Sequence, residues 1–416
     1  MTYTTTLIIP FGFDCDMGEI GKIEEKIEKS GIWTRSMYNC SNVYRHIAEL
    51  YDSRNKSRVA AIYTASGQTI QDKFTGTRYF CLKVNTDNQT LTFKYSYEKL
   101  QLYVFESGVG FLCLGLSFEQ IEAIRYLRNV VKSGTSHMRY TGNNQYQEYP
   151  MIKIITQLLS FNENDIFFST LHADKFAQAV TFSYACTTSE RSETTLYSLL
   201  HMVDENEYSD ETENFGEEHI IPFRGMQWGI SSRNIAAVQD ERSAKAEKDF
   251  KGKLFSEYLP LIILAYHQKY AMIKFSAMVN GTPAQIRDAR NDIIDFKVRS
   301  SFVSVSDTQV FQQLYDKIMS VNKIDDMIKE NDRKLDSLLT RENNAHRAKL
   351  EKVTGVITLL FTVMGITSIL TDGMTAVDSL VAVEYQPVAN IILLAACAGL
   401  AAIGGYGIHI VRKHTK

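Results

Sequence analysis

The last 64 residues contain two long apolar runs, VTGVITLLFTVMGITSIL at Val353–Leu370 and VANIILLAACAGLAAIGGYGIHIV at Val388–Val411. The runs are 18 and 24 residues long and hold no Asp, Glu, Lys or Arg. Because a bilayer core of about 30 Å requires roughly 20 apolar residues in a helix, they predict transmembrane helices at 353–371 and 388–411. A buried helical hairpin in a soluble protein is the alternative, but the second run lacks the polar face that such a hairpin would carry.

Basic residues flank this pair of runs, and acidic residues lie between them. The basic residues are Arg341, Arg347, Lys349 and Lys352 before the first run and Arg412, Lys413 and Lys416 after the second. The segment 372–387 holds Asp372, Asp378 and Glu384 and no Lys or Arg. Since basic flanks stay on the cytoplasmic side, this pattern predicts a multi-pass protein of the cell inner membrane. Both termini would be cytoplasmic, with an outer acidic loop at 372–387 and a basic tail at 412–416.

The composition argues against several functional classes. A formal net charge of −3 gives no reason to expect direct nucleic-acid binding. The six cysteines show no C-x-x-C spacing, so neither a disulfide framework nor a zinc site is indicated. The sequence contains no pattern typical of a hydrolytic triad, a phosphate-binding P-loop or an H-E-x-x-H helix. We therefore expect no enzymatic activity.

The residues before the apolar runs divide into three parts. Residues 1–232 predict an α/β cytosolic domain with an antiparallel sheet and helices on one face; the expected strands are 79–84, 91–95, 102–106 and 110–116, and a helix is expected at 118–131. Residues 233–305 predict a helical layer, inside which the apolar run 259–265, interrupted by Pro260, should be buried. The pattern at 306–309 resembles a capping box, and no Gly or Pro follows as far as Lys352. These features predict one long stalk helix at 306–352 that continues into the first span.

The predicted stalk helix has an apolar seam that also contains acidic residues. Its apolar positions alternate at three and four residues: Phe311, Leu314, Ile318, Val321, Ile328, Leu335 and Leu339. Asp325 and Asp332 lie on the same seam, seven residues apart. Either the stalk helices of several subunits surround a water-filled axis, or each helix lies on the domain of its own chain and its turns nearer the membrane are solvated. If the protein transports divalent cations, Asp325 and Asp332 are the candidate metal ligands between cytosolic domains.

The first span carries a stripe of small and polar residues at helical spacing. The stripe consists of Thr354, Thr358, Thr362, Gly365, Ser368 and Asp372. Such a face either packs against a neighbouring helix or lines a water-filled conduit. Two spans cannot enclose a pore alone, so a pore requires a symmetric oligomer with the first span inside and the second facing lipid. Asp372, Asp378 and Glu384 would then concentrate cations at the outer mouth.

Two clusters in the cytosolic domain are candidate ligand-binding residues. The segment PFRGMQWGISSRN places Arg224, Trp228 and Arg233 close together in the sequence, and an aromatic ring with guanidinium groups could stack a base and hold a phosphate. A structural turn around a buried Trp228 is the alternative. A second basic cluster contains Arg125, Arg128 and Arg139, near the end of the predicted helix 118–131. Cations at a helix C-terminus also complement the helix dipole without any ligand.

This arrangement resembles the CorA-type metal-ion transporter family. The shared features are an α/β cytosolic domain, a very long stalk helix that becomes the first span, a short outer loop, a second span and a basic cytosolic tail. Gly373-Met374-Thr375 stands where that family has Gly-Met-Asn. Thr375 replaces the Asn whose carboxamide is the family's characteristic filter group for hydrated magnesium. With the polar stripe, the resemblance makes Gly373 and Met374 candidate pore residues together with Thr358, Thr362, Gly365 and Ser368.

Within that family, the chain is similar to the CorA-like membrane effectors associated with type III CRISPR systems. That similarity implies a homopentameric channel that binds a nucleotide second messenger, a SAM-AMP conjugate, in its cytosolic domain. It would act in antiviral defence by ion leakage or membrane disruption. A first alternative is a Mg²⁺ transporter gated by cytosolic metal, and a second is a non-conducting membrane tether. The expected ligand is accordingly a nucleotide or Mg²⁺, and the expected partners are further copies of the chain and the lipid bilayer.

Overall fold

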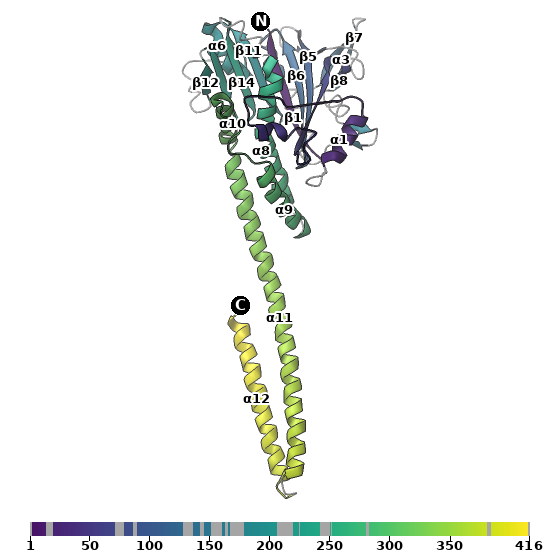
Figure 1. The fold of residues 1–416 in the computed structure, drawn as a ribbon, viewed down its shortest axis with the longest axis vertical. Helices are drawn as coiled ribbons and strands as arrows, with labels where there is room; N and C mark the ends of the chain where they lie inside the picture. Colours follow the sequence, from purple (N-terminus) through teal and green to yellow (C-terminus); the bar gives the residue numbers. More distant parts are fainter. Residues whose placement is uncertain are drawn as a thin grey trace. The chain divides into compact units, whose positions relative to one another are not determined.

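The computed structural model divides the chain into two compact units, Met1–Asp332 and Arg333–Lys416 (Figure 1). The structure describes residues 2–13, 20–70, 79–85, 90–127, 136–141, 145–150, 160–162, 165–166, 179–205, 219–223, 225–241, 250, 252–279, 283–380 and 384–414. The first unit holds a large sheet with helices packed on it. The second unit holds the C-terminal helices.

The first unit is built on a twelve-stranded sheet. Ten strands follow one another in space: β12 (His219–Phe223), β13 (Met226–Ile230), β14 (Asn234–Asp240), β11 (Val180–Thr187), β1 (Tyr3–Gly12), β6 (Val109–Phe118), β5 (Thr90–Phe105), β4 (Tyr79–Asn85), β7 (Ser136–Thr141) and β8 (Gln145–Pro150). β3 (Ala60–Ser66) also pairs with β5, and β2 (Thr34–Ser36) pairs with β3. A separate pair joins β9 (Ser160–Asn162) to β10 (Asp165–Ile166).

The predicted antiparallel sheet is largely confirmed, with one parallel pair. β11 and β14 run parallel, because the chain crosses between them through α6 (Ser192–His201) and the β12–β13 hairpin. The predicted strands 91–95 and 102–106 are two parts of one long strand, β5, whose register shifts between Tyr97 and Leu100. The predicted helix 118–131 is wrong at its start, because Phe118 is the last residue of β6 and the described helical turns cover 123–127.

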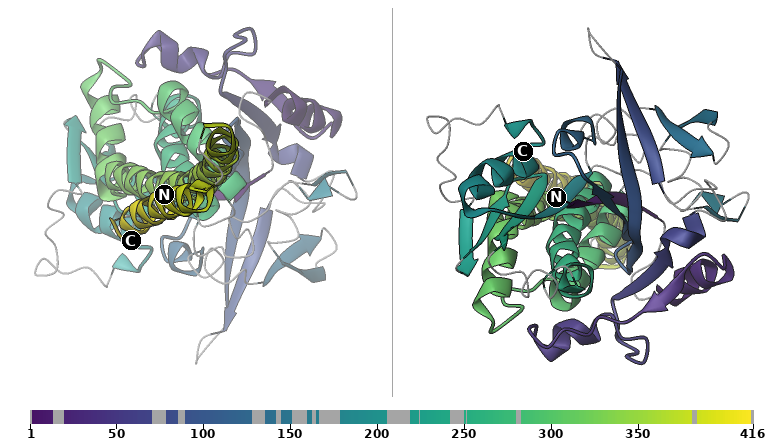
Figure 2. Two further views of the ribbon diagram at one scale, coloured as in Figure 1. Left: turned by 90° about the horizontal axis from the view of Figure 1, so that it is seen from below. Right: turned by 90° about the horizontal axis from the view of Figure 1, so that it is seen from above.

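Helices cover both faces of the sheet, so the prediction that they lie on one face is wrong (Figure 2). Neighbouring residues of β13 show this directly, because side chains alternate between the two faces of a strand. A Cβ at Gly229 would lie 2.9 Å from a methyl of Leu200 on α6. The Trp228 ring instead packs on the other face, against Phe250 and Tyr258. The alternation was too weak to indicate this, because β1, β6 and β11 are buried along their whole length.

The second face is covered by a helical layer. It contains the π-helical turn η7 (Leu254–Tyr258), α8 (Leu259–Val279), α9 (Pro283–Arg299) and α10 (Gln309–Val321). The expected burial of 259–265 is confirmed. Pro260 does not end the helical run, because the π-helical turn η7 directly precedes it and changes the hydrogen-bond pattern there. The Gln101 amide donates to the carbonyl of Phe255 in that turn at 3.2 Å. The other short helices are α1 (Ile20–Lys29), α2 (Arg45–Glu49), α3 (Gly67–Ile70) and η3 (Ser189–Arg191).

The predicted stalk helix at 306–352 is divided into two helices. α10 ends at Val321, and α11 begins at Ile324 and continues to Leu380. Between them, the Asn322 side chain donates to the carbonyl of Ile318 at 2.9 Å, and Lys323 has a left-handed φ of 52°. Asn competes for backbone acceptors in this way and so ends helices without any Gly or Pro. The capping box is also not formed: Thr308 is the N-cap residue and makes no side-chain cap bond.

The burial of Trp228 predicts a large stability effect. The ring is 0% exposed and packs against Phe182, Phe250 and Tyr258. Trp228→Ala should lower the free energy of unfolding by about 3–5 kcal/mol, because it leaves a cavity in the core. Met37→Ala, at a residue that is 55% exposed, should change it by less than about 0.5 kcal/mol. Denaturant unfolding of the detergent-solubilised chain, followed by circular dichroism, measures both; equal effects would contradict the core position of Trp228.

Candidate functional site

The C-terminal unit contains a long apolar helical segment. Within α11, the segment Arg347–Leu380 spans 34 residues and is long and apolar enough to cross a membrane. α12 (Gln386–His414) follows, and its described apolar part, Gln386–Gly399, is shorter. The structure therefore contains one helix that meets the requirements of a membrane span by length and composition.

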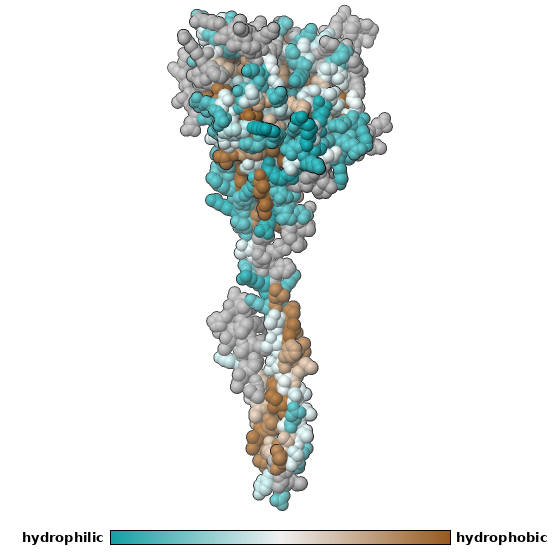
Figure 3. Space-filling view, viewed as in Figure 1, coloured by the Kyte–Doolittle hydropathy of each residue, from teal (hydrophilic) through white to brown (hydrophobic). Residues whose placement is uncertain are grey.

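Exposed apolar side chains are concentrated on these two helices (Figure 3). Of the twenty large hydrophobic residues that are exposed in the described part of the chain, sixteen lie between Leu350 and Tyr406. Phe361 is 69% exposed and Met364 is 67% exposed. Contiguous apolar surface of this kind marks a membrane or protein interaction site, because water solvates it poorly.

α11 and α12 pack against each other along one stripe of each helix. On α11 the partly covered positions recur at three or four residues: Thr362, Ile366, Leu370, Gly373 and Val377. On α12, Leu393 is partly covered and Cys397 is buried. The helices approach each other closely at Gly373, where an added Cβ would lie 2.8 Å from a methyl of Leu393. Gly373 therefore serves helix packing within the hairpin in this structure.

The predicted outer loop at 372–387 is helical over most of its described residues. α11 continues to Leu380, which places Asp372 and Asp378 in its last turns, and α12 already begins at Gln386. The run Met374–Leu380 includes enough good helix formers and apolar residues to continue the helix past the acidic positions. The Gln386 amide donates to the carbonyl of Asp378 at 3.2 Å and helps to close the turn. Glu384 is exposed within that turn.

The polar stripe of α11 lies mainly outside the α11–α12 contact. Thr358, Gly365, Ser368 and Asp372 are exposed, and Thr362 lies at the edge of the contact. The hydroxyls of Thr358 and Thr362 each donate to the carbonyl four residues earlier at 2.8 Å, so their protons are satisfied within the helix. Their oxygen lone pairs remain available as acceptors. Met374 is 40% exposed and lies next to Gly373 rather than on the stripe.

The structure does not gather the predicted ligand-binding residues into one site. Trp228 has no exposed face, so a base could stack on it only after core side chains moved. Arg233 is exposed in the β13–β14 turn, and Arg224 lies outside the described residues. The pKa of Lys269 is lowered to about 8, mainly by burial and to a lesser extent by the charge of Arg233.

The second basic cluster is also not assembled among the described residues. Arg125 forms an ion pair with Asp204 at 2.7 Å, which satisfies its charge without a ligand. Arg139 is in β7, opposite Gln147 of β8, and Arg128 lies outside the described residues. Arg125 and Arg139 thus belong to different elements of the first unit.

The two candidate metal ligands have different surroundings. The Asp332 carboxylate accepts hydrogen bonds from the ammonium of Lys297, whereas Asp325 is exposed. Among the described residues of one chain, no three His, Cys, Asp or Glu side chains are grouped as they would be around a metal ion. An ion bound by Asp332 would have to displace Lys297.

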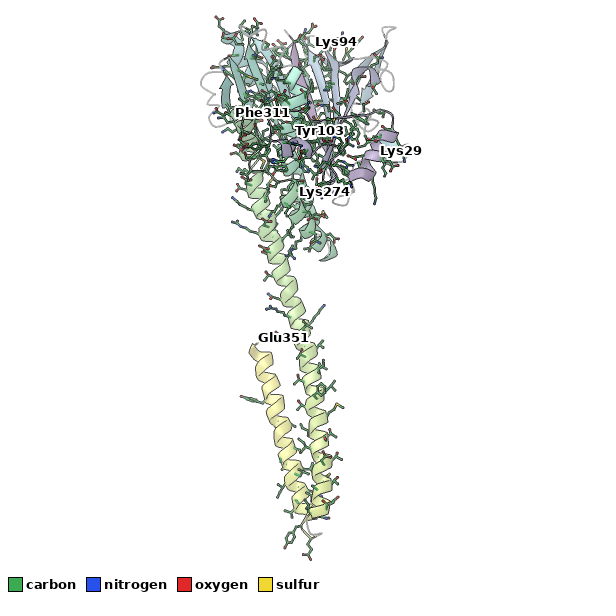
Figure 4. The ribbon with its side chains drawn as sticks, in the orientation of Figure 1. Lys29, Lys94, Tyr103, Lys274, Phe311 and Glu351 are labelled. Atoms are coloured by element: carbon green, nitrogen blue, oxygen red, sulfur yellow. The ribbon has the colours of Figure 1, made fainter. Side chains whose placement is uncertain are left out.

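A buried polar cluster that the sequence did not indicate lies where the β5–β6 turn meets α8 and α9 (Figure 4 labels Lys274 in it). Glu106 is fully buried and pairs with Arg299 at 3.0 Å. Ser107 Oγ lies 2.8 Å from Nε2 of His267. Burial lowers the pKa of His267 to about 3, so its imidazole is neutral at physiological pH. A glutamate and a serine before a glycine turn were the only sequence signal.

No protein-family model, curated protein or solved structure matches this chain. The class of protein rests on the fold itself. It is an α/β protein with a C-terminal helical hairpin, one helix of which is long and apolar enough to cross a membrane.

The two glycines of α11 give a matched test of the hairpin. Gly373→Val should lower the melting temperature of the detergent-purified protein, because a side chain there collides with Leu393 at a cost of about 1–3 kcal/mol. Gly365→Val changes helix propensity equally but meets no atom within 4 Å. It should leave the hairpin contact intact. Similar losses for the two variants would contradict the observed packing of α11 on α12.

Proposed function

We propose that this protein is the subunit of an oligomeric inner-membrane channel whose α/β body binds a regulator. One observation carries the proposal: α11 is a continuous helix that begins among the helices of the first unit and includes the apolar segment Arg347–Leu380. A ligand bound to the body thus has a covalent, helical connection to the membrane segment.

We place both C-terminal helices in the membrane, with the two termini in the cytoplasm. α12 has 29 residues, which exceeds the roughly 20 needed to span the hydrocarbon core. The basic residues before the first span and after the second favour this orientation. The exposed apolar surface of both helices supports contact with lipid.

The channel requires several copies, and the uncovered stripe of α11 supports this requirement. A hairpin of two helices cannot enclose water, whereas a ring of hairpins can. Thr358, Gly365 and Ser368 are left open by α12 and could line such a ring. Asp372, Asp378 and Glu384 would lie at its outer mouth. The resemblance to CorA-type proteins favours a homopentamer.

The regulator we propose is a nucleotide second messenger of the SAM-AMP type, acting in type III CRISPR antiviral defence. This part rests on the resemblance and on the exposed Arg233 of the body. Opening follows if the messenger binds the open state more tightly than the closed state. Ion leakage or membrane disruption would then follow infection.

A ligand screen tests the regulator. Melting temperatures of the purified oligomer are measured with SAM-AMP, ATP, cyclic oligoadenylates or Mg²⁺, because a ligand at 100 times its Kd stabilises the folded state by about 2.7 kcal/mol. We expect a shift with SAM-AMP that Arg233→Ala removes and Arg54→Ala, at an exposed arginine paired with Asp52, preserves. A shift with Mg²⁺ alone would replace this proposal with a metal transporter.

Ion flux from proteoliposomes tests the pore. Thr358→Leu should reduce flux severalfold, because it replaces an acceptor on the open stripe with an apolar side chain. Thr367→Leu is the control, since Thr367 lies on another side of α11 and its exposure is similar. Both variants should remain oligomeric by size-exclusion chromatography. Absence of flux from the oligomeric wild-type protein with every ligand would favour a non-conducting tether.

A further inference from the structure

The β5–β6 turn is held by side chains from two helices. Lys274 of α8 donates to the carbonyls of Ser107, at 2.9 Å, and Phe13, at 3.2 Å. Gly108 makes this approach possible: its φ is +71°, and a Cβ there would lie 2.0 Å from the Lys274 ammonium. Arg299, in the last turn of α9, pairs with the buried carboxylate of Glu106. The position of this turn is therefore linked to the ends of α8 and α9.

The same last turn of α9 also holds α11. Lys297 lies two residues before Arg299, and its ammonium binds both oxygens of Asp332 on α11. The neighbouring residue, Asn331, is buried and donates to the carbonyl of Met272 on α8 at 3.0 Å. One turn of α9 thus contacts the β5–β6 turn through Arg299 and α11 through Lys297.

A break in the helix lies next to this attachment. α10 ends at Val321, and Lys323 has a left-handed φ. The Lys269 ammonium on α8 donates to Oδ1 of Asn322 at 2.7 Å, so α8 also holds the break. Because the backbone is not helical at residues 322–323, α11 could change its angle without carrying α10 with it.

We propose that Lys297 and Arg299 form a two-ended bridge that sets the position of α11 according to the position of the β5–β6 turn. Displacement of Glu106 would pull the end of α9 through Arg299 and change the Lys297–Asp332 contact. These residues are positioning residues for the gating movement, so the gating role rests on the proposed function. The coupling itself does not, and it is measurable without ion flux.

Hydrogen exchange of the full-length, detergent-purified protein tests the bridge. Glu106→Gln, which keeps the shape of the side chain, should accelerate exchange in 324–332 at least severalfold, although residue 106 lies in the β5–β6 turn and not on α11. Asp332→Asn should do the same. The control is Asp204→Asn, which removes a carboxylate from another ion pair, with Arg125, and should leave 324–332 unchanged. Unchanged exchange in 324–332 with Glu106→Gln would overturn the proposal.

A double-mutant cycle provides a second test that does not depend on one variant. Glu106→Gln and Asp332→Asn together should change the opening equilibrium of 324–332 by less than the product of their separate effects, with a difference of roughly threefold or more. Independent effects would overturn the bridge. The charge exchange Lys297→Asp with Asp332→Lys should restore slow exchange lost in Lys297→Asp, and failure to do so would also count against it.

Proteoliposome flux separates this inference from the proposed function. If exchange shows coupling and Asp332→Asn changes the ligand dependence of flux, both stand. If exchange shows coupling but no variant or wild-type oligomer conducts ions, the bridge stands and the channel function fails. If flux is ligand-dependent and exchange in 324–332 is independent of Glu106, the channel stands and the bridge fails.

Discussion

The apolar surface of α11 and α12 is the constraint on which the rest of the C-terminal unit depends. The packing of α11 on α12, which includes the contact of Gly373 with Leu393, covers one stripe of each helix. Side chains such as Phe361 and Met364 remain exposed. A water-soluble protein would have covered these side chains with its own chain. Lipid and further copies are the two surroundings that satisfy such a surface. The proposed membrane insertion and the proposed oligomerisation would both cover this apolar surface.

In the proposed membrane arrangement, the acidic residues would limit how deeply α11 can lie in the hydrocarbon core. A charged side chain at the centre of a membrane helix costs about 2.5–3.5 kcal/mol on insertion scales, and the cost falls towards the interface. Asp372 and Asp378 lie in the last turns of α11, near the connection to α12. α11 continues to Leu380, but the part of it that suits the hydrocarbon core ends near Thr371. A span that ends at residue 371, as the sequence predicts, is therefore compatible with a helix that continues to Leu380.

Periodicity predicted the regular elements well where one physical signal dominated. The apolar run before Thr371 and the strands of β4, β5 and β6 are examples. It failed where a single side chain decided the outcome. Asn322 ends α10 by bonding to Ile318, although no Gly or Pro marks the position. The sequence around Trp228 was compatible with a ligand site and with a buried structural role, and the packing of Phe250 and Tyr258 places the ring in the core.

The candidate sites depended on residues that are distant in the sequence, which is why the sequence assembled them poorly. Arg125 pairs with Asp204, which lies 79 residues later in the sequence, and Lys297 pairs with Asp332, which lies 35 residues later. Neither partner could be inferred from spacing on one helix. The fully buried carboxylate of Glu106 was hidden for the same reason, since its partner Arg299 is in a helix of the opposite layer.

The α10–α11 break gives the long helix a role that one unbroken helix could not have. A helix of 306–352 would have been fixed by the core contacts of Phe311 and Leu314, and any tilt would have required that core to move. With the break at Asn322, polar contacts help to fix the start of α11. Lys269 contacts Asn322 just before the helix, Met272 accepts a hydrogen bond from its Asn331, and Lys297 pairs with its Asp332. Polar contacts of this kind can exchange one partner for another or for water. A regulator of the proposed kind could therefore favour one set of polar partners, whereas the fully buried Ile324 keeps the first turn of α11 in the apolar core.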